Sequence, residues 1–137
     1  MIVFDASALI AYLRNETGAA FVENLLDEAD VEKVAHAVNL CEVFSKFSLL
    51  SDEPTAFAAL ADLRTAGIVE RSDMDALLWQ DAGRLVATQR GNGHGLSLGD
   101  SFGLALARRL GADFVIFDRA EFEPIEAAGL ASVTFIR

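Results

Sequence analysis

The sequence has few of the residues that build disulfides or zinc sites. Cys41 is its one cysteine, and the chain has two histidines. An intrachain disulfide is therefore excluded, and the set is too small for a cluster of Cys and His ligands around zinc. Any metal bound by this chain would use oxygen ligands.

Long apolar runs and an excess of positive charge are also absent. The chain is 53% hydrophobic, but its apolar runs are only a few residues long, so no segment is predicted to span a membrane. The formal net charge is −10, from 11 Lys+Arg against 21 Asp+Glu, which argues against nonspecific binding of duplex nucleic acid. Residues 1–5 lack the basic and apolar segments of a signal peptide, and we expect a cytoplasmic protein.

What the sequence does contain is the alternation of an α/β protein. Its 137 residues and apolar composition predict one folded domain spanning residues 1–137. Short apolar runs typical of buried parallel strands lie at 2–4, 34–35, 68–69, 114–117 and 133–136, with helical patterns between them. We therefore predict a three-layer α/β/α sandwich with a central, mostly parallel sheet. Residues typical of helix starts are Ser7, Thr17, Pro54, Ser72 or Asp73, and Ser97.

Two aspartates stand directly behind predicted strands. Asp5 follows the first strand and Asp118 the fourth. Ligands of open α/β sheets bind in the crevice beyond the carboxyl ends of the strands, and two acids there favour a cation. Aspartate is also common in turns and helix caps, so a structural role stays open for each residue.

Two further acids lie on predicted helices. Ser97 and Asp100 have the spacing of a capping box, and the glycine-rich stretch before them would bring Asp100 to the same strand ends. Glu42 shares a polar helix face with Asn39 and Lys46, opposite an apolar stripe. Periodicity alone leaves open whether this face meets water or a cleft.

Four blocks of sequence resemble, in order, the acidic blocks of PIN domains, and look most like those of VapC toxins from toxin–antitoxin pairs. They are Asp5-Ala6-Ser7, Val38-Asn39-Leu40-Cys41-Glu42-Val43, Leu96-Ser97-Leu98-Gly99-Asp100-Ser101 and Val115-Ile116-Phe117-Asp118-Arg119. The resemblance covers essentially the whole chain. It implies a PIN-like fold in which Asp5, Glu42, Asp100 and Asp118 form a catalytic, metal-binding cluster, supported by Ser7 and Asn39.

The last block departs from the family pattern. PIN domains often carry a threonine or serine just before the final acid, whereas this chain has Ile116 and Phe117 there. Glu121 and Glu123 are nearby acids that could substitute for Asp118.

The resemblance implies a Mg²⁺-dependent endoribonuclease, with Mn²⁺ as the alternative ion. Such a toxin hydrolyses RNA phosphodiesters by metal-activated water and is neutralised by a cognate antitoxin, as a homodimer or in a toxin–antitoxin hetero-oligomer. Basic side chains that could hold flanking phosphates are Lys46, Arg84, Arg90, Arg108 and Arg119.

Two other functions fit part of the pattern. One is a catalytically silent PIN-fold binding domain, although all four acids are present. The other is a different Mg²⁺-dependent phosphoryl-transfer protein. Phosphatases with a strand-end aspartate usually carry a second one two residues later, where this chain has Ser7, and receiver domains offer a lysine near the last strands, where this chain has none after Lys46.

Overall fold

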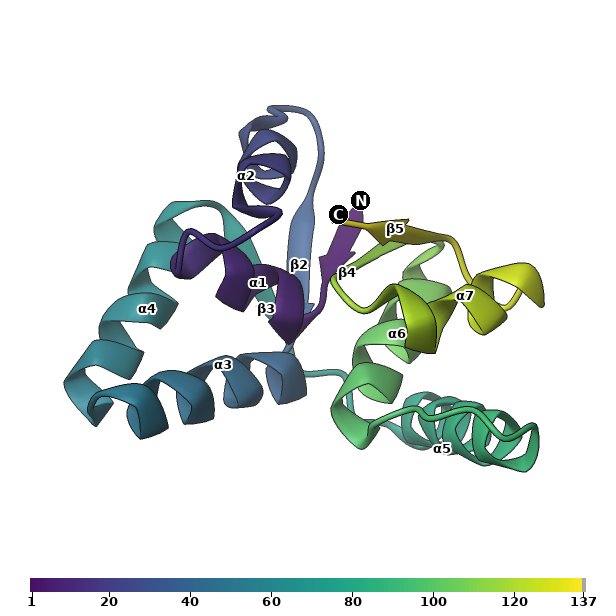
Figure 1. Cartoon of the computed structure of the whole chain (residues 1–137). Helices are drawn as coiled ribbons and strands as arrows, with labels where there is room; N and C mark the ends of the chain where they lie inside the picture. The colour runs from purple at the N-terminus through teal and green to yellow at the C-terminus, as the bar shows by residue number, and fades with distance from the viewer. Residues whose placement is uncertain (137) are drawn as a thin grey trace.

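A parallel five-stranded sheet forms the centre of the protein. The structure is a computed structural model and describes residues 1–136. The strands lie in the order β3-β2-β1-β4-β5, and every neighbouring pair is parallel (Figure 1). This confirms the predicted sheet. The strands are β1 (Ile2–Phe4), β2 (Lys33–His36), β3 (Ile68–Arg71), β4 (Asp113–Ile116) and β5 (Val133–Phe135).

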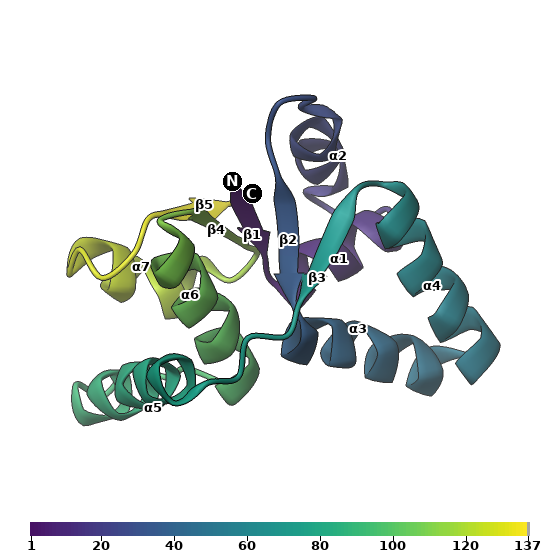
Figure 2. The same cartoon turned by 180° about the vertical axis from the view of Figure 1, so that it is seen from behind.

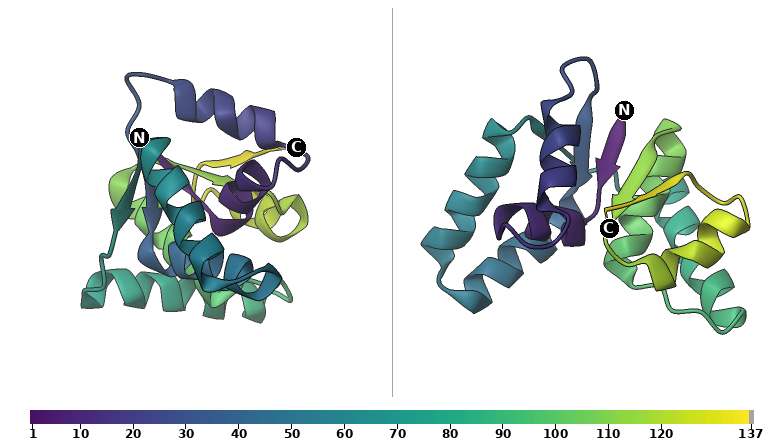
Figure 3. Two further views of the ribbon diagram at one scale, coloured as in Figure 1. Left: turned by 90° about the vertical axis from the view of Figure 1, so that its left-hand side faces the viewer. Right: turned by 45° about the horizontal axis from the view of Figure 1, so that its top comes forward.

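Seven helices connect and cover the described strands. They are α1 (Ala6–Leu13), α2 (Ala19–Asp27), α3 (Ala37–Leu50), α4 (Glu53–Thr65), α5 (Ala76–Gly91), α6 (Leu98–Leu110) and α7 (Arg119–Ala127). Helices α1 to α4 lie on one side of β1, and α5 to α7 lie on the other (Figures 1, 2 and 3). None of these helices is both long and apolar enough to cross a membrane.

The alternation of side chains along β1 explains the three layers. Ile2 and Phe4 join one buried cluster with residues of α1 to α4, while Val3 joins a second cluster with residues of α5, α6 and α7. Successive side chains of a strand point to opposite faces, so a strand covered on both sides must be apolar throughout. Burial of each large apolar side chain stabilises the fold by roughly 1.5–3 kcal/mol. The predicted α/β/α sandwich is confirmed.

Three of the predicted helix starts are wrong by a few residues. Asp5, rather than Ser7, caps α1, because the chain is still extended at Asp5 and its carboxylate accepts a hydrogen bond from the Ser7 amide. Helix α2 begins after Gly18 rather than at Thr17, and Gly18 has a left-handed φ of 92°. Asp75, rather than Ser72 or Asp73, caps α5. Ser97 caps α6 as predicted.

Ion pairs hold the segment before α5 against α6. The Arg109 guanidinium contacts Asp73 at 3.0 Å and Asp75 at 2.5 Å, and Arg71 contacts Asp73 at 2.9 Å. His36 is buried below this segment, where its Nε2 donates to the Asp73 carbonyl and its Nδ1 accepts from the Val38 amide. His36 therefore has a structural role.

Candidate metal centre

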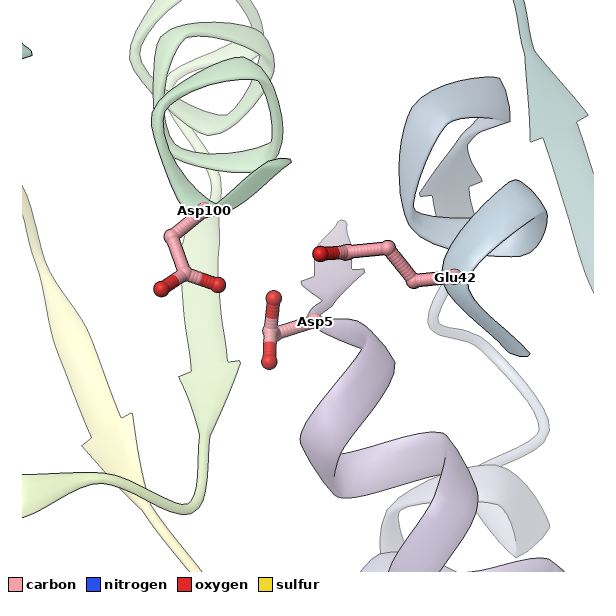
Figure 4. Close-up of side chains that lie close together, drawn as sticks. All are labelled: Asp5, Glu42 and Asp100. Atoms are coloured by element: carbon pink, nitrogen blue, oxygen red, sulfur yellow. The ribbon is translucent and has the colours of Figure 1, made fainter. Parts of the chain in front are cut away.

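Three carboxylates converge at the carboxyl end of β1. Each of Asp5, Glu42 and Asp100 offers an oxygen, and these oxygens all lie within 4.8 Å of one another. Asp5 follows β1, Glu42 lies on α3, Asp100 lies in the first turn of α6, and their carboxylates point towards a common space (Figure 4). Oxygens that share one hard cation, with metal–oxygen distances of about 2.0–2.6 Å, can be no further apart than about twice that distance. The three acids are therefore close enough to share one hard divalent cation, and the Mg²⁺–oxygen distance of about 2.1 Å requires only a small inward movement of the side chains.

Asp5 is the most deeply buried member of the cluster. Its side chain is 2% exposed; its Oδ2 accepts from the Ser7 amide at 2.8 Å, and its Oδ1 accepts from Asn39 Nδ2 at 3.3 Å. Burial, and then the charge of Asp100, raise the pKa of Asp5 well above its usual value, although the bonds from Ser7 oppose this shift. A carboxylate held in such a place is stabilised by a cation beside it.

Glu42 fits into the cluster because residue 99 has no side chain. A Cβ on Gly99 would lie 2.4 Å from Glu42 Oε1 and 2.7 Å from Oε2, so any other residue would displace the carboxylate. Burial raises the pKa of Glu42; a hydrogen bond from Asn39 lowers it, and the charge of Asp100 raises it further. The polar face of α3 that carries Glu42 therefore packs beside the first turn of α6.

Asn39 links the elements that carry the acids. Its side chain is fully buried, and its Nδ2 lies 3.3 Å from Asp5 Oδ1, 3.2 Å from Glu42 Oε2 and 3.1 Å from the Gly99 carbonyl oxygen. The amide has two N–H donors, so three acceptors share them. Asn39 Oδ1 is buried without a partner among the described residues. Reversing the amide would place that oxygen against two carboxylates, so the acids determine its orientation.

Asp100 lies in the capping turn of α6, but its carboxylate does not close the predicted capping box, because the Ser97 amide donates to Glu121 instead. The Asp100 backbone amide donates to Ser97 Oγ at 3.1 Å, which begins α6. Its carboxylate belongs to the cluster, one turn or less from the positive end of the helix dipole, where negative charge is stabilised. Ser7 supports the same end of the sheet, since its Oγ accepts from the Phe117 amide at 3.1 Å.

Asp118 lies outside this group of three. It is exposed, and its carboxylate caps α7 by accepting from the Glu121 amide at 3.1 Å. Glu121 Oε1 in turn accepts from the Ser97 amide at 3.2 Å. Burial, then the charges of Asp100 and Asp118, raise the pKa of Glu121. Glu123 pairs with Arg119 instead. The structure therefore gathers three of the four predicted acids, with Asp118 and Glu121 beside them.

The chain matches one protein family along most of its length. A model of the PIN domain matches residues 2–126. The chain belongs to the PIN domain family. No curated protein sequence matches it significantly.

Solved structures of similar fold are mostly toxin–antitoxin proteins. VapBC2 from Rickettsia felis, bound to a promoter DNA fragment, aligns with a TM-score of 0.78 at 15% identity, covering 98% of both chains. VapBC-1 from nontypeable Haemophilus influenzae gives 0.74 at 16% identity, covering 99% of this chain and 98% of that one. Mycobacterium tuberculosis VapC20, described as a toxin that cleaves the sarcin-ricin loop, gives 0.71 at 19% identity and covers 94% and 95%. These likenesses show a shared fold.

Sequence reasoning named Asn39 as a supporting residue of the centre but missed its burial, and it missed the role of Gly99 altogether. Asn39 was expected on a polar face but is buried, and Gly99 appeared only as a spacer between Ser97 and Asp100. The polar residue one helical turn before Glu42 was the available signal for Asn39. No sequence pattern pointed to the close approach of Glu42 and Gly99, because it joins two distant helices.

Proposed function

We propose that this PIN domain is a Mg²⁺-dependent endoribonuclease toxin of the VapC type. The observation that carries the proposal is the convergence of Asp5, Glu42 and Asp100 on one site, with carboxylate oxygens within 4.8 Å. An all-oxygen donor set suits hard divalent cations such as Mg²⁺ or Mn²⁺. Toxin–antitoxin proteins of the same fold, one of them described as a loop-cleaving toxin, support the assignment.

Asp5, Glu42 and Asp100 would hold the metal, with Asp118 or Glu121 as a fourth acid at the edge. A bound Mg²⁺ supplies a Lewis acid, which makes a water a better nucleophile and offsets charge on the phosphate. The chain itself positions the acids. Asn39 holds one oxygen of Asp5 and one of Glu42, and the Ser7 amide holds the other oxygen of Asp5. With these oxygens already oriented, little reorganisation is needed when the phosphodiester enters.

The cluster is also poised to take up positive charge. Burial and the neighbouring Asp100 raise the pKa of Asp5, and burial first and then Asp100 raise the pKa of Glu42, so full ionisation is unfavourable in the isolated protein. A dication offsets this cost. The acidic chain, at −10, binds phosphates poorly by its own charge, and the loaded site would supply the missing local positive charge.

We further propose that a cognate antitoxin binds and silences the enzyme, in a hetero-oligomer or on a toxin homodimer, in the cytoplasm. The related VapBC structures are toxin–antitoxin assemblies. Exposed apolar side chains on the α3–α4 hairpin support a protein interface: Leu49 is 85% exposed, Phe57 57% and Leu50 51%. Three large exposed apolar side chains on one helical hairpin are compatible with a protein interface.

The test is cleavage of a structured RNA by the purified protein with and without metal. We expect cutting only with Mg²⁺ or Mn²⁺, and its loss in Asp5→Asn and Asp100→Asn, while Glu126→Gln on the exposed face of α7 stays active. Cleavage that persists undiminished in chelator would remove the metal mechanism. A folded wild-type protein that binds RNA but never cuts it would instead identify a silent binding domain.

A further inference from the structure

A groove runs along one face of α1, beside the acidic cluster. It has a volume of about 290 Å³ and is lined by Ser7, Ile10, Ala11 and Arg14 of α1, and by Lys46 and Phe117. The four α1 residues recur at helical spacing, so they form one stripe about 10 Å long. The groove is large enough for one nucleotide.

The groove begins at the edge of the proposed metal centre. Ser7 lines it, and the Ser7 amide donates to Asp5. Lys46 lies one helical turn after Glu42 on α3, so both side chains lie on the same face of that helix. A strand whose phosphate sits at the acids therefore has this groove as a neighbouring path.

Most other cations of the chain are held elsewhere. Arg108 pairs with Asp81, Arg109 with Asp73 and Asp75, and Arg119 with Glu123. Lys33 is buried and donates to the Glu28 carbonyl. Lys46 is exposed and, like Arg64, Arg84 and Arg90, has no ion-pair partner among residues 1–136, but it is the one of these four that lines the groove.

The charge of the groove is opposite to that of the chain as a whole. Lys46 and Arg14 contribute two positive charges, and Glu16, paired with Arg14 at 2.6 Å, contributes one negative charge. In a protein of net charge −10, a second RNA phosphate binds most favourably at a positively charged site next to the acidic metal centre. The apolar floor of Ile10 and Ala11 can receive a sugar or base.

We propose that this groove is a nucleotide subsite, in which Lys46 binds the RNA phosphate next to the cleaved bond. The inference rests on the proposed ribonuclease function and adds the path of the strand to it. Arg14 is the second cation of the subsite and stands about 10 Å further along α1 than Ser7.

The experiment compares Lys46→Glu with Arg84→Glu. Arg84 was one of the predicted phosphate-binding side chains, but it is exposed on α5 and does not line the groove, and the substitution makes the same charge change. Binding of a fluorescently labelled single-stranded RNA is measured by anisotropy in the inactive Asp100→Asn background, over a series of salt concentrations. We expect Lys46→Glu to weaken binding on the order of five-fold at low salt and to reduce the salt slope by about 0.7 per lost contact. Arg84→Glu should change neither quantity beyond the general effect of net charge.

Cleavage kinetics in the otherwise wild-type protein give an independent reading. Lys46→Glu should raise KM and leave kcat within about two-fold, because the contact is made equally in the bound substrate and the transition state. Equal RNA binding by the Lys46→Glu and Arg84→Glu variants, with normal wild-type cleavage, would overturn the subsite alone. So would a Lys46→Glu protein that binds RNA normally but loses capture of a protein partner. Failure of the wild-type protein to cleave RNA at all would count against the proposed function itself.

Discussion

The carboxylate of Glu42 lies where a side chain on Gly99 would grow. A Cβ at position 99 would come within 2.4 Å of Glu42 Oε1 and 2.6 Å of its Cδ. Glu42 belongs to α3 and Gly99 to the first turn of α6, so the absence of one methyl group lets two helices share the site. The same close approach lets Asn39 reach the Gly99 carbonyl oxygen.

Gly99→Ala should therefore damage the centre more than the fold. The methyl group would push Glu42 away from Asp5 and Asp100, and we expect metal affinity and cleavage to fall by at least about ten-fold. Gly83→Ala is the matched control, because Gly83 is also helical and a Cβ there would meet nothing within 4 Å. That control should gain roughly 0.5–1 kcal/mol of stability and keep full activity. Unchanged Mg²⁺ titration by Gly99→Ala would refute the steric argument.

Variants of Asn39 should distinguish a role in orienting the acids from a role in packing alone. Asn39→Ala removes the donor to Asp5 and Glu42, and we expect a loss of about 1–2 kcal/mol in stability, with a smaller upward shift of Tm by Mg²⁺. Asn39→Asp replaces the donor with another acid, so its metal-free Tm should be lower still. Asn24→Ala, on an exposed part of α2, is the control. If Mg²⁺ raises the Tm of Asn39→Ala as much as that of the wild-type protein, Asn39 does not orient the acids for the metal.

The fourth acid can be identified by removing one charge at a time. Asp118→Asn keeps the helix cap, since asparagine caps as well as aspartate, and Glu121→Gln keeps an acceptor for the Ser97 amide. We expect Glu121→Gln to reduce cleavage more, because Glu121 is the less exposed residue and responds to the charge of Asp100. Cleavage rates of the two variants, measured at the same Mg²⁺ concentration, show which acid is the fourth member of the cluster. A larger effect of Asp118→Asn would restore Asp118 as the fourth member.

Stability of the metal-free protein should rise as the pH is lowered from neutral towards the ordinary carboxyl pKa of about 4. Burial raises the pKa of Asp5 and Glu42 in the folded state, so their contribution is full below the ordinary value of about 4 and is lost as the pH rises through the raised pKa. Mg²⁺ should increase Tm most at the upper end of this range. Asp73 has the opposite effect. The hydrogen bond from Arg71 lowers the pKa of Asp73, so the contribution of Asp73 to stability is lost only when the pH falls through that lowered pKa.

Asp5→Asn provides the control for that pH series. It removes the most strongly shifted group but changes the net charge by only one, so overall repulsion in the acidic chain is almost preserved. Its Tm should vary less with pH and respond less to Mg²⁺. A variant with the same pH slope as the wild-type protein would show that net charge, rather than the buried carboxylate, causes the effect.

Local patterns predicted the fold well, because each strand and helix carries its own signal. The apolar runs at β1 and β4 required cover on both faces, and Ser97 marked the start of α6. The strands of the sheet were correctly expected to be parallel. The error at Ser7 arose because several residues near a helix start can cap it, and the last extended residue, Asp5, takes that role. At Thr17 the helix instead begins after Gly18, which is left-handed and gives no side-chain cap.

The candidate site was predictable only where the backbone determines position. Asp5 follows β1, and Asp100 follows its cap, so topology alone brings them together. To place Glu42 in the site, one must know which element faces α3. That depends on contacts with α6, which no local sequence pattern encodes. Asp118 also follows its strand, but α7 begins immediately after it, and the free amides of that helix attract its carboxylate.

The place of β1 in the sheet has a consequence for the newly made chain. β1 lies between β2 and β4, and β4 and α6 come late in the sequence. Asp5 and Glu42 thus leave the ribosome long before Asp100 does. Strand β1 can pair with β4 only after β4 has also been synthesised. A nascent chain that ends before α6 lacks Asp100, so the three-carboxylate cluster is complete only after α6 has been synthesised.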